Sequence, residues 1–354
     1  MIDFRRVDQW HIGNNEVEKA WLNGVLVWMN NKHLPFYVEN ITNEDQQVAV
    51  SWEDSNYYAP SITIYTSWDN ITWELWGTTR TAVLSKWLPA GSRLFMRANA
   101  THWALMDSAS NPGGGMAFNV IHGMSKVGGN IMSLLYGSNF EGKTTITNEQ
   151  AYHSAFGRLF YGYQNNLVDA SNLILPATTL ANNCYNRMFD TCTVLEKAPV
   201  LPATTLVEGC YSSMFSGCTA LENAPELPAT TLANYCYRYM FSGCTALENA
   251  PELPALTLAQ DCYNSMFQGC TSLETAPELP APTLVQSCYS LMFYNCPLIN
   301  SIKCLATDIS AFGCTSFWVD GVAANGTFIK NPNMSSWSTG TSGIPSGWTI
   351  QDAS

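Results

Sequence analysis

The amino-acid sequence predicts a mixed, β-rich fold in which an N-terminal β-hairpin and a β-sandwich precede a solenoid of 26-residue repeats. From Leu175 onward the chain repeats itself every 26 residues without insertion. Before that point, short apolar runs alternate with turn residues, as in a β-sandwich. These observations divide the chain into a hairpin segment (1–30), a sandwich (31–135), a solenoid with its capping units (136–315) and a C-terminal cap (316–354).

The hairpin segment is predicted from the stretch "EKAWLNGVLVW". Asn23-Gly24 separates two apolar alternations there, and this dipeptide favours the type I′ turn of a tight hairpin. Similar short openings, of the form Lys-x-Trp/Tyr-x-Asn-Gly-x-x-Val-Trp, resemble the N-termini of phage tail and fibre proteins. Two interpretations stay open for this segment: a docking element for other virion proteins, or an ordinary edge hairpin.

The sandwich is predicted from the runs "QQVAVSW", "SITIYTSW", "TWELWG" and "SRLFMRAN", which have strand-like composition and are separated by turn residues. Trp68, Trp73, Trp76 and Trp87 fall near the expected strand ends or turns. An exposed indole at such a place stacks well on a sugar ring, because its body is apolar and its tip is polar. Core packing explains the same tryptophans equally well, so both interpretations stay open.

The solenoid is predicted from the strict period itself. The Met-Phe pair recurs in register at Met188, Met214, Met240, Met266 and Met292, and a period of this length is typical of units that bury their faces only against neighbours. One unit cannot fold alone, because ordering its backbone costs more than its few apolar side chains return. Leu221–Pro228 is expected to form a short strand and bend. Thr231–Gly243 is expected to form a short helix or turn, since Leu232, Cys236 and Met240 are spaced by four.

The motifs Leu-Pro, Cys-Tyr-x-x-Met-Phe and Gly-Cys-Thr-x-Leu resemble the BspA-like leucine-rich repeats of surface proteins from gut and oral anaerobes and their phages. The resemblance covers about half of the chain and implies an α/β leucine-rich-repeat solenoid. "AFGRLF" (155–160) lacks both cysteines of the pattern, and "IKCLATDISAFGCTSFW" (302–318) lacks the Met-Phe pair. Degenerate first and last units are what capping of such an array requires.

The twelve cysteines all lie between Cys184 and Cys314, and ten of them form two columns, one per repeat position. Stacked small hydrophobic side chains, disulfides and a metal site are the three interpretations. Metal sites need clustered ligands, whereas this spacing is C-x7-C and no histidine follows His153. Free cysteine is among the most buried residue types, so the sequence favours stacked buried columns.

Two surfaces of the repeats are candidates for recognition. Glutamates recur in two columns, which is typical of a solvated face or of an acidic strip for Ca²⁺ or a basic receptor. Two other positions vary from copy to copy over the constant scaffold, as in an evolving recognition surface or in an unselected one. Together with the tryptophans, the candidate recognition residues are Arg187, Tyr235, Tyr239, Asp261, Glu222, Glu226, Glu248, Glu252, Glu274, Glu278, Trp68, Trp73 and Trp76.

Composition limits the function classes further. The formal net charge of −12 argues against nucleic-acid binding, which rewards clustered Lys and Arg. No stretch is long and apolar enough to span a bilayer, and no apolar signal-peptide core follows the first arginines. The five histidines are scattered singly, without H-E-x-x-H, G-x-S-x-G or P-loop spacing. We therefore expect no enzyme activity, no catalytic residues, no cofactor and no metal.

The expected function is that of a non-catalytic virion protein: a phage tail- or capsid-fibre component that recognises a host-surface glycan or protein. Its partners would be other virion proteins through the N-terminal region, without nucleic acid or membrane insertion, and a homo-oligomer is possible. The expected location is the virion surface. The alternative is a secreted or cell-surface leucine-rich-repeat adhesin of a gut bacterium, located outside the bacterial cell.

Overall fold

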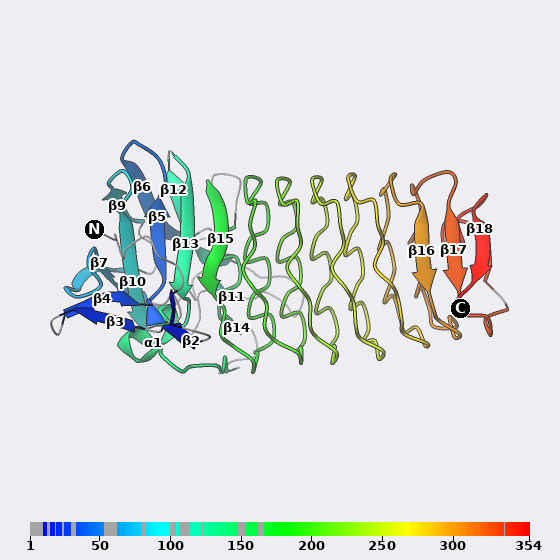
Figure 1. Ribbon diagram of the computed structural model, residues 1–354, viewed down its shortest axis with the longest axis horizontal. Coiled ribbons are helices and arrows are strands. Elements are labelled where there is room, and N and C mark those ends of the chain that lie inside the picture. The colour runs from blue at the N-terminus through cyan, green and yellow to red at the C-terminus, as the bar shows by residue number, and fades with distance from the viewer. Residues whose placement is uncertain are drawn as a thin grey trace.

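The computed structural model describes residues 10–12, 15–17, 19–22, 25–29, 33–52, 62–79, 83–99, 104–105, 114–121, 123–147, 153–161, 166–335 and 337–354. These residues are β-rich and contain almost no helix. The short helix α1 (Ser133–Tyr136) and the 3-10 helix η3 (Gly137–Asn139) lie between strands and repeats. The molecule is elongated, with several sheets at its N-terminal end, stacked rungs in the middle and a small sheet at its C-terminal end (Figure 1).

Two antiparallel strand pairs open the chain. Strand β1 (Trp10–Ile12) pairs with β2 (Asn15–Val17), and β3 (Lys19–Leu22) pairs with β4 (Val25–Met29). The second pair lies where the sequence predicts a hairpin, and its strands are separated by two residues only. The predicted turn residues Asn23-Gly24 lie outside the described residues.

Two larger sheets follow. The six-stranded sheet has the order β15-β13-β5-β10-β7-β8, and the five-stranded sheet has the order β14-β11-β12-β6-β9. The strands of the first sheet are β5 (Tyr37–Asn40), β7 (Ile62–Ser67), β8 (Glu74–Thr79), β10 (Arg93–Asn99), β13 (Ser125–Asn130) and β15 (Leu167–Ile174). The strands of the second are β6 (Gln46–Trp52), β9 (Leu84–Leu88), β11 (Ala104–Leu105), β12 (Gly114–Ile121) and β14 (His153–Ser154).

Both sheets contribute side chains to one buried core. Val48 from β6, Ile64 from β7 and Met96 from β10 are fully buried in it. Phe36, just before β5, lies 5.2 Å from Phe118 of β12, measured between ring centroids. The alternation of buried and exposed residues along β7 and β9 follows from the pleat, which turns successive side chains to opposite faces.

The core of the sheets continues into the core of the repeats. Strand β15 pairs in parallel with β13, so a strand of the expected solenoid segment joins the sheet of the expected sandwich segment. The ring of Phe160 lies 6.2 Å from Phe118 on one side and 5.1 Å from Phe189 of the first complete rung on the other. The buried residues of the two parts therefore form one continuous cluster.

Each rung consists of an extended segment and a series of tight turns. We call the column formed by the turn segments 181–192, 207–218, 233–244, 259–270, 285–296 and 311–322 the turn ribbon. Its backbone N–H groups alternate between two acceptors: Tyr237 N donates to Cys262 O in the next rung at 3.0 Å, whereas Met240 N donates to Tyr237 O in its own rung at 3.1 Å. The rungs therefore hold one another by main-chain hydrogen bonds.

The turn ribbon corrects one sequence-based expectation, the helix that an α/β repeat implies. Thr231–Gly243 forms consecutive turns and no helix. The reason is a left-handed residue at every fourth position, with φ of 61° at Tyr235, 56° at Tyr239 and 75° at Gly243. A right-handed helix cannot pass through such residues. The spacing of four that resembled a helical face is the period of these turns.

The interior of the stack consists of aligned columns of identical side chains. Tyrosine rings stack on tyrosine rings and phenylalanine rings on phenylalanine rings, for example Tyr237 on Tyr263 and Phe241 on Phe267, both at 5.8 Å. All twelve cysteines are free and buried, which confirms the stacked columns that the sequence favours. The thiols also donate hydrogen bonds: Cys244 Sγ lies 3.1 Å from Phe215 O.

Both ends of the stack carry atypical units. At the N-terminal end, Phe156 stacks on Tyr185 at 5.7 Å. At the C-terminal end, Trp318 stacks on Tyr289 at 6.3 Å, and its Nε1 donates to Gly343 O at 2.8 Å. Three parallel strands close the chain: β16 (Ser301–Cys304), β17 (Thr327–Lys330) and β18 (Thr349–Asp352).

Candidate recognition surface

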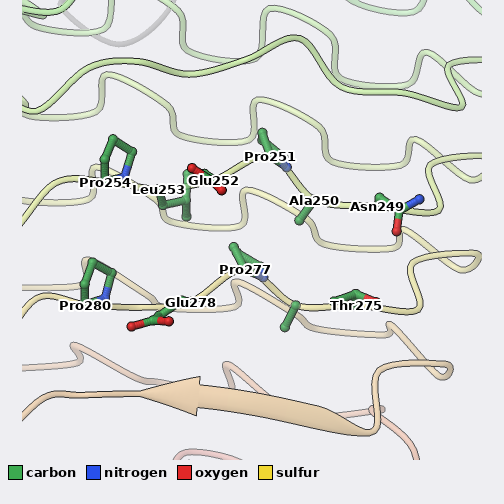
Figure 2. A pocket seen from close by; sticks show the side chains of 11 residues that line it. Asn249, Ala250, Pro251, Glu252, Leu253, Pro254, Thr275, Pro277, Glu278 and Pro280 are labelled. Atoms are coloured by element: carbon green, nitrogen blue, oxygen red, sulfur yellow. The ribbon is translucent and has the colours of Figure 1, made fainter.

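The glutamate columns lie on the extended segments of the rungs. All six predicted glutamates are exposed, and Glu274 N donates to Glu248 O at 3.0 Å, so neighbouring copies are in direct register. Glu252 and Glu278 line a shallow groove of about 430 Å³ between two rungs, beside Pro251 and Pro277 (Figure 2). Lys303 of the last extended segment pairs with Glu278 at 2.9 Å.

This face is exposed to solvent. Its carboxylates are open to water, where like charges one rung apart repel only weakly. Among the residues that the structure describes, no group of three or more His, Cys, Asp or Glu side chains could hold a metal ion. The groove between the rungs is bordered by proline rings and alanines together with the two glutamates.

The variable positions lie on the turn ribbon, and the structure gives them a property that the sequence did not reveal. Arg187, Tyr235, Tyr239 and Asp261 all adopt left-handed backbone conformations, with φ of 55°, 61°, 56° and 53°. Every residue equivalent to them does the same: Asn183, Gly209, Ser213, Ser265, Ser287, Leu291, Gly313 and Phe317. The conformation costs about 1–2 kcal/mol at a residue other than glycine.

Tyr235 and Tyr239 form a cluster with Arg238, which lies between them in sequence. The guanidinium carbon of Arg238 lies 5.7 Å from the ring centroid of Tyr235 and 4.9 Å from that of Tyr239. Such cation–π contacts hold both rings and the guanidinium in place. The three side chains are partly exposed, and Arg238 Nε has no hydrogen-bond partner among the described residues.

The next rung adds a polar network beside these rings. Gln260 Nε2 donates to the Tyr235 hydroxyl and to Asp261 Oδ2, both at 3.1 Å. Asn264 Nδ2 donates to Asp261 Oδ1 at 2.8 Å. Both carboxylate oxygens are therefore fixed in orientation, while each keeps a free lone pair. We call Tyr235, Arg238, Tyr239, Gln260, Asp261 and Asn264 together the Tyr235 cluster.

Three members of the Tyr235 cluster were missed by the sequence-based prediction: Arg238, Gln260 and Asn264. A signal was present, because the positions of Arg238 and Asn264 also vary between copies, where other repeats have Asn186, Ser212 and Ser290. Sequence alone did not show that Arg238 contacts Tyr235 and Tyr239, or that Asn264 contacts Asp261. The turns decide these contacts, since they bring residues three apart together, as Tyr235 with Arg238 and Asp261 with Asn264.

Arg187 lies two repeats before Tyr239 and belongs to a different group. Its Nε is 3.8 Å from Asp190 Oδ2. Burial raises the pKa of Asp190 to about 6, and the charges of Arg187 and Arg158 offset part of this effect. The structure therefore brings together Tyr235, Tyr239 and Asp261, but not Arg187.

The three tryptophans do not form one platform. Trp68 is 42% exposed, with Lys86 Nζ 5.6 Å above its ring. The guanidinium of Arg97 lies 4.0 Å from the ring centroid of Trp73. Trp76 packs against the core, and its Nε1 donates to Ser85 O at 3.4 Å. Of these three side chains only Trp68 is exposed, and Trp87 of β9 is also exposed, at 63%.

Comparisons with protein-family models, with curated proteins and with solved structures gave no match. Within the described ranges, no helix has the length and apolar character needed to cross a membrane.

Proposed function

We propose that this chain is a non-catalytic virion protein, a phage tail- or capsid-fibre component whose leucine-rich-repeat solenoid recognises a host-surface glycan or protein. Recognition is assigned to the turn ribbon, with the Tyr235 cluster at its centre. The sheets at the N-terminal end, a β-sandwich in this proposal, and the hairpins before it attach the chain to other virion proteins. The site of action is the virion surface.

The observation that carries the proposal is the contrast between constant and variable columns. The buried columns of Cys, Tyr, Met and Phe are the same in successive rungs, and main-chain hydrogen bonds fix the rungs to one another. The outward positions of the turn ribbon change from glycine to tyrosine to aspartate at one equivalent place. A rigid scaffold that presents changing polar and aromatic side chains pays little conformational entropy on binding, which suits recognition.

The glutamate columns have a different part in the proposal. They are constant over three successive rungs and exposed, so they give the extended segments of these rungs a negative charge. Such a face keeps long, repetitive particles soluble and apart from one another. This assignment separates a recognition side, the turn ribbon, from a solvated side, the extended segments.

Two measurements test the proposed function. The labelled full-length chain should bind, saturably, to intact cells of a subset of gut anaerobes, and it should release no sugar from their surfaces. Mass spectrometry of virions purified from a lysate that contains this gene should detect the chain. Presence on the encoding bacterium and absence from virions would favour the adhesin instead, whereas hydrolysis of surface glycans would contradict the non-catalytic assignment.

A further inference from the structure

We infer that the Tyr235 cluster is a binding site for a neutral carbohydrate, in which a pyranose ring lies against Tyr235 and Tyr239 and its hydroxyls bond to Asp261 and Asn264. This inference rests on the proposed function and specifies the ligand class of the turn ribbon. It assigns the two tyrosines, Arg238 and the network of the next rung to one subsite that spans two adjacent repeats.

The turn does not require a tyrosine at either place. Both adopt left-handed φ values that disfavour a bulky side chain. The repeat before them has Gly209 and Ser213 at the same two places, with the same backbone hydrogen bonds to the next rung. Both rings are partly exposed and take no part in the buried stack, which is built from Tyr237 and its equivalents. The left-handed conformation belongs to the turn, because Gly209, Ser213 and Leu291 share it, so the turn accepts tyrosine at these two places without requiring it.

The rings have the geometry of a stacking platform. Arg238 contacts both of them, at 5.7 Å and 4.9 Å, so neither ring has to be ordered when a ligand arrives. A pyranose ring presents an apolar face of C–H groups and an edge of hydroxyls. The partly exposed faces of Tyr235 and Tyr239 are complementary to the apolar C–H face, because aromatic rings bury apolar surface while keeping a polar tip.

The polar network matches the hydroxyl edge. Gln260 and Asn264 each occupy one lone pair of a different Asp261 oxygen, at 3.1 Å and 2.8 Å, which leaves each oxygen an acceptor for a hydroxyl. Polar groups that are already oriented lose little entropy on binding. The amide of Asn264 is held in turn, since its Oδ1 accepts from Ser265 Oγ at 2.9 Å.

Charge selects a neutral sugar over an acidic one. Within the cluster, the positive charge of Arg238 is balanced by the negative charge of Asp261. An acidic sugar placed on the carboxylate would be repelled by it and by the formal net charge of −12 that the whole chain carries. A neutral sugar meets neither penalty.

The test uses the full-length chain and an array of neutral and acidic bacterial polysaccharides and oligosaccharides. Three variants install the residue of another repeat: Tyr235→Gly as in Gly209, Tyr239→Ser as in Ser213, and Asp261→Ser as in Ser287. We expect each variant to raise the Kd for the bound neutral glycan about tenfold or more. The two tyrosine variants lose one aromatic contact each, and Asp261→Ser loses two hydrogen bonds. Melting temperatures should stay close to that of the wild type, because the new residues already occur in folded copies.

Matched controls separate this site from others. Tyr294→Ser also removes an exposed tyrosine from the turn ribbon and installs the residue of Ser242, but it lies outside the cluster, so glycan binding should be unchanged. Trp68→Ala removes an exposed indole of the N-terminal sheets and should likewise leave binding intact.

The outcomes distinguish the inference from the function on which it rests. Neutral-glycan binding that the three cluster variants lose, and the two controls keep, supports the site. Binding that survives in the cluster variants or fails in Trp68→Ala overturns the site and leaves the proposed function standing. Binding to cells without binding to any neutral glycan, or binding abolished by protease treatment of the cells, overturns the carbohydrate assignment alone. Absence of both cell and glycan binding overturns both proposals.

Discussion

At the scale of single residues, the tyrosine stack contains polar groups that the fold does not satisfy. Tyr185 and Tyr211 are buried and their rings stack at 5.6 Å, yet neither hydroxyl has a hydrogen-bond partner among the described residues. Burial raises the pKa of both phenols, so they stay neutral. A buried hydroxyl without a partner costs about 1–3 kcal/mol, whereas the ring itself contributes to the stack.

We therefore predict that Tyr211→Phe stabilises the protein. The change removes the unsatisfied hydroxyl, keeps the stacked ring, and should increase the free energy of unfolding by about 1 kcal/mol. Thermal unfolding followed by circular dichroism would show a rise in Tm of roughly 2 °C.

The matched control is Phe215→Tyr in the neighbouring column, where the added hydroxyl enters a fully buried position and should lower the Tm. A fall in Tm for Tyr211→Phe would show that the hydroxyl has a stabilising partner that the described residues do not include.

At the scale of one element, the turn ribbon depends on neutral thiols. Burial raises the pKa of Cys184, Cys236 and Cys244 to about 12, from an ordinary value near 9. Those of Cys210, Cys218 and Cys270 are also raised by burial. The thiols also donate hydrogen bonds to the backbone: Cys270 Sγ donates to Phe241 O at 3.0 Å. A thiolate could not donate this bond, because it carries no proton.

Alkaline pH should therefore unfold the protein steeply. Below about pH 9 the thiols are protonated in both the folded and the unfolded state, so their ionisation does not change the free energy of unfolding. Between pH 9 and about 12 they ionise in the unfolded chain only, so the unfolded state binds fewer protons and the free energy of unfolding falls with rising pH. Each such thiol contributes a loss of about 1.4 kcal/mol per pH unit. Denaturant titrations at pH 8, 9 and 10 would measure the decline.

Thiol reactivity gives an independent check of the same columns. At pH 8 the native chain should react slowly with a disulfide reagent, and the cysteines should become reactive on unfolding, since the thiolate is the nucleophile. Fast reaction of several native thiols would contradict the buried columns.

At the scale of the whole molecule, stability is a sum of contacts between neighbouring rungs. Ring centroids in the phenylalanine column are 5.4–5.9 Å apart from Phe189 to Phe293, with nearly parallel planes. The C-terminal end is closed by Trp318, which lies between Tyr289 and Trp337. The stability of a rung that meets the same neighbours above and below therefore does not depend on its position in the stack.

We predict that deletion of one whole repeat, residues 201–226, leaves a folded protein. The junction joins residue 200 to Leu227, so Cys184, Tyr185, Met188 and Phe189 meet the equivalent residues of the next copy. Circular dichroism should keep its shape, the unfolding transition should stay cooperative, and small-angle scattering should give a molecule shorter by one rung, about 6 Å.

Deletion of half a repeat, residues 201–213, is the control. It places extended segments against turn segments and exposes the ring columns, so this variant should be insoluble or unfolded. Equal stability of the two deletions would contradict the nearest-neighbour stack.

The sequence allowed much of the interior to be predicted, and less of the surface. Met240 and Phe241 fall in an invariant pair, so their burial follows from the period. Over Thr231–Gly243 the sequence predicted a short helix or a turn, and the structure has turns. The sequence could not decide between the two, because nothing in it marks the left-handed backbone of Tyr235 and Tyr239. For the same reason Arg238 was missed: its contact with both tyrosines depends on the turns that lie between them.

By itself, the sequence determined that copies spaced 26 residues apart bury the same side chains, because a unit of that size cannot bury its apolar surface alone. Only the tertiary structure decided which way the remaining side chains face. Left-handed residues at every fourth position turn Tyr235, Tyr239 and Asp261 outward, and hydrogen bonds between rungs bring Gln260 and Asn264 beside them. The period is a property of the sequence, whereas the Tyr235 cluster arises only where two copies meet.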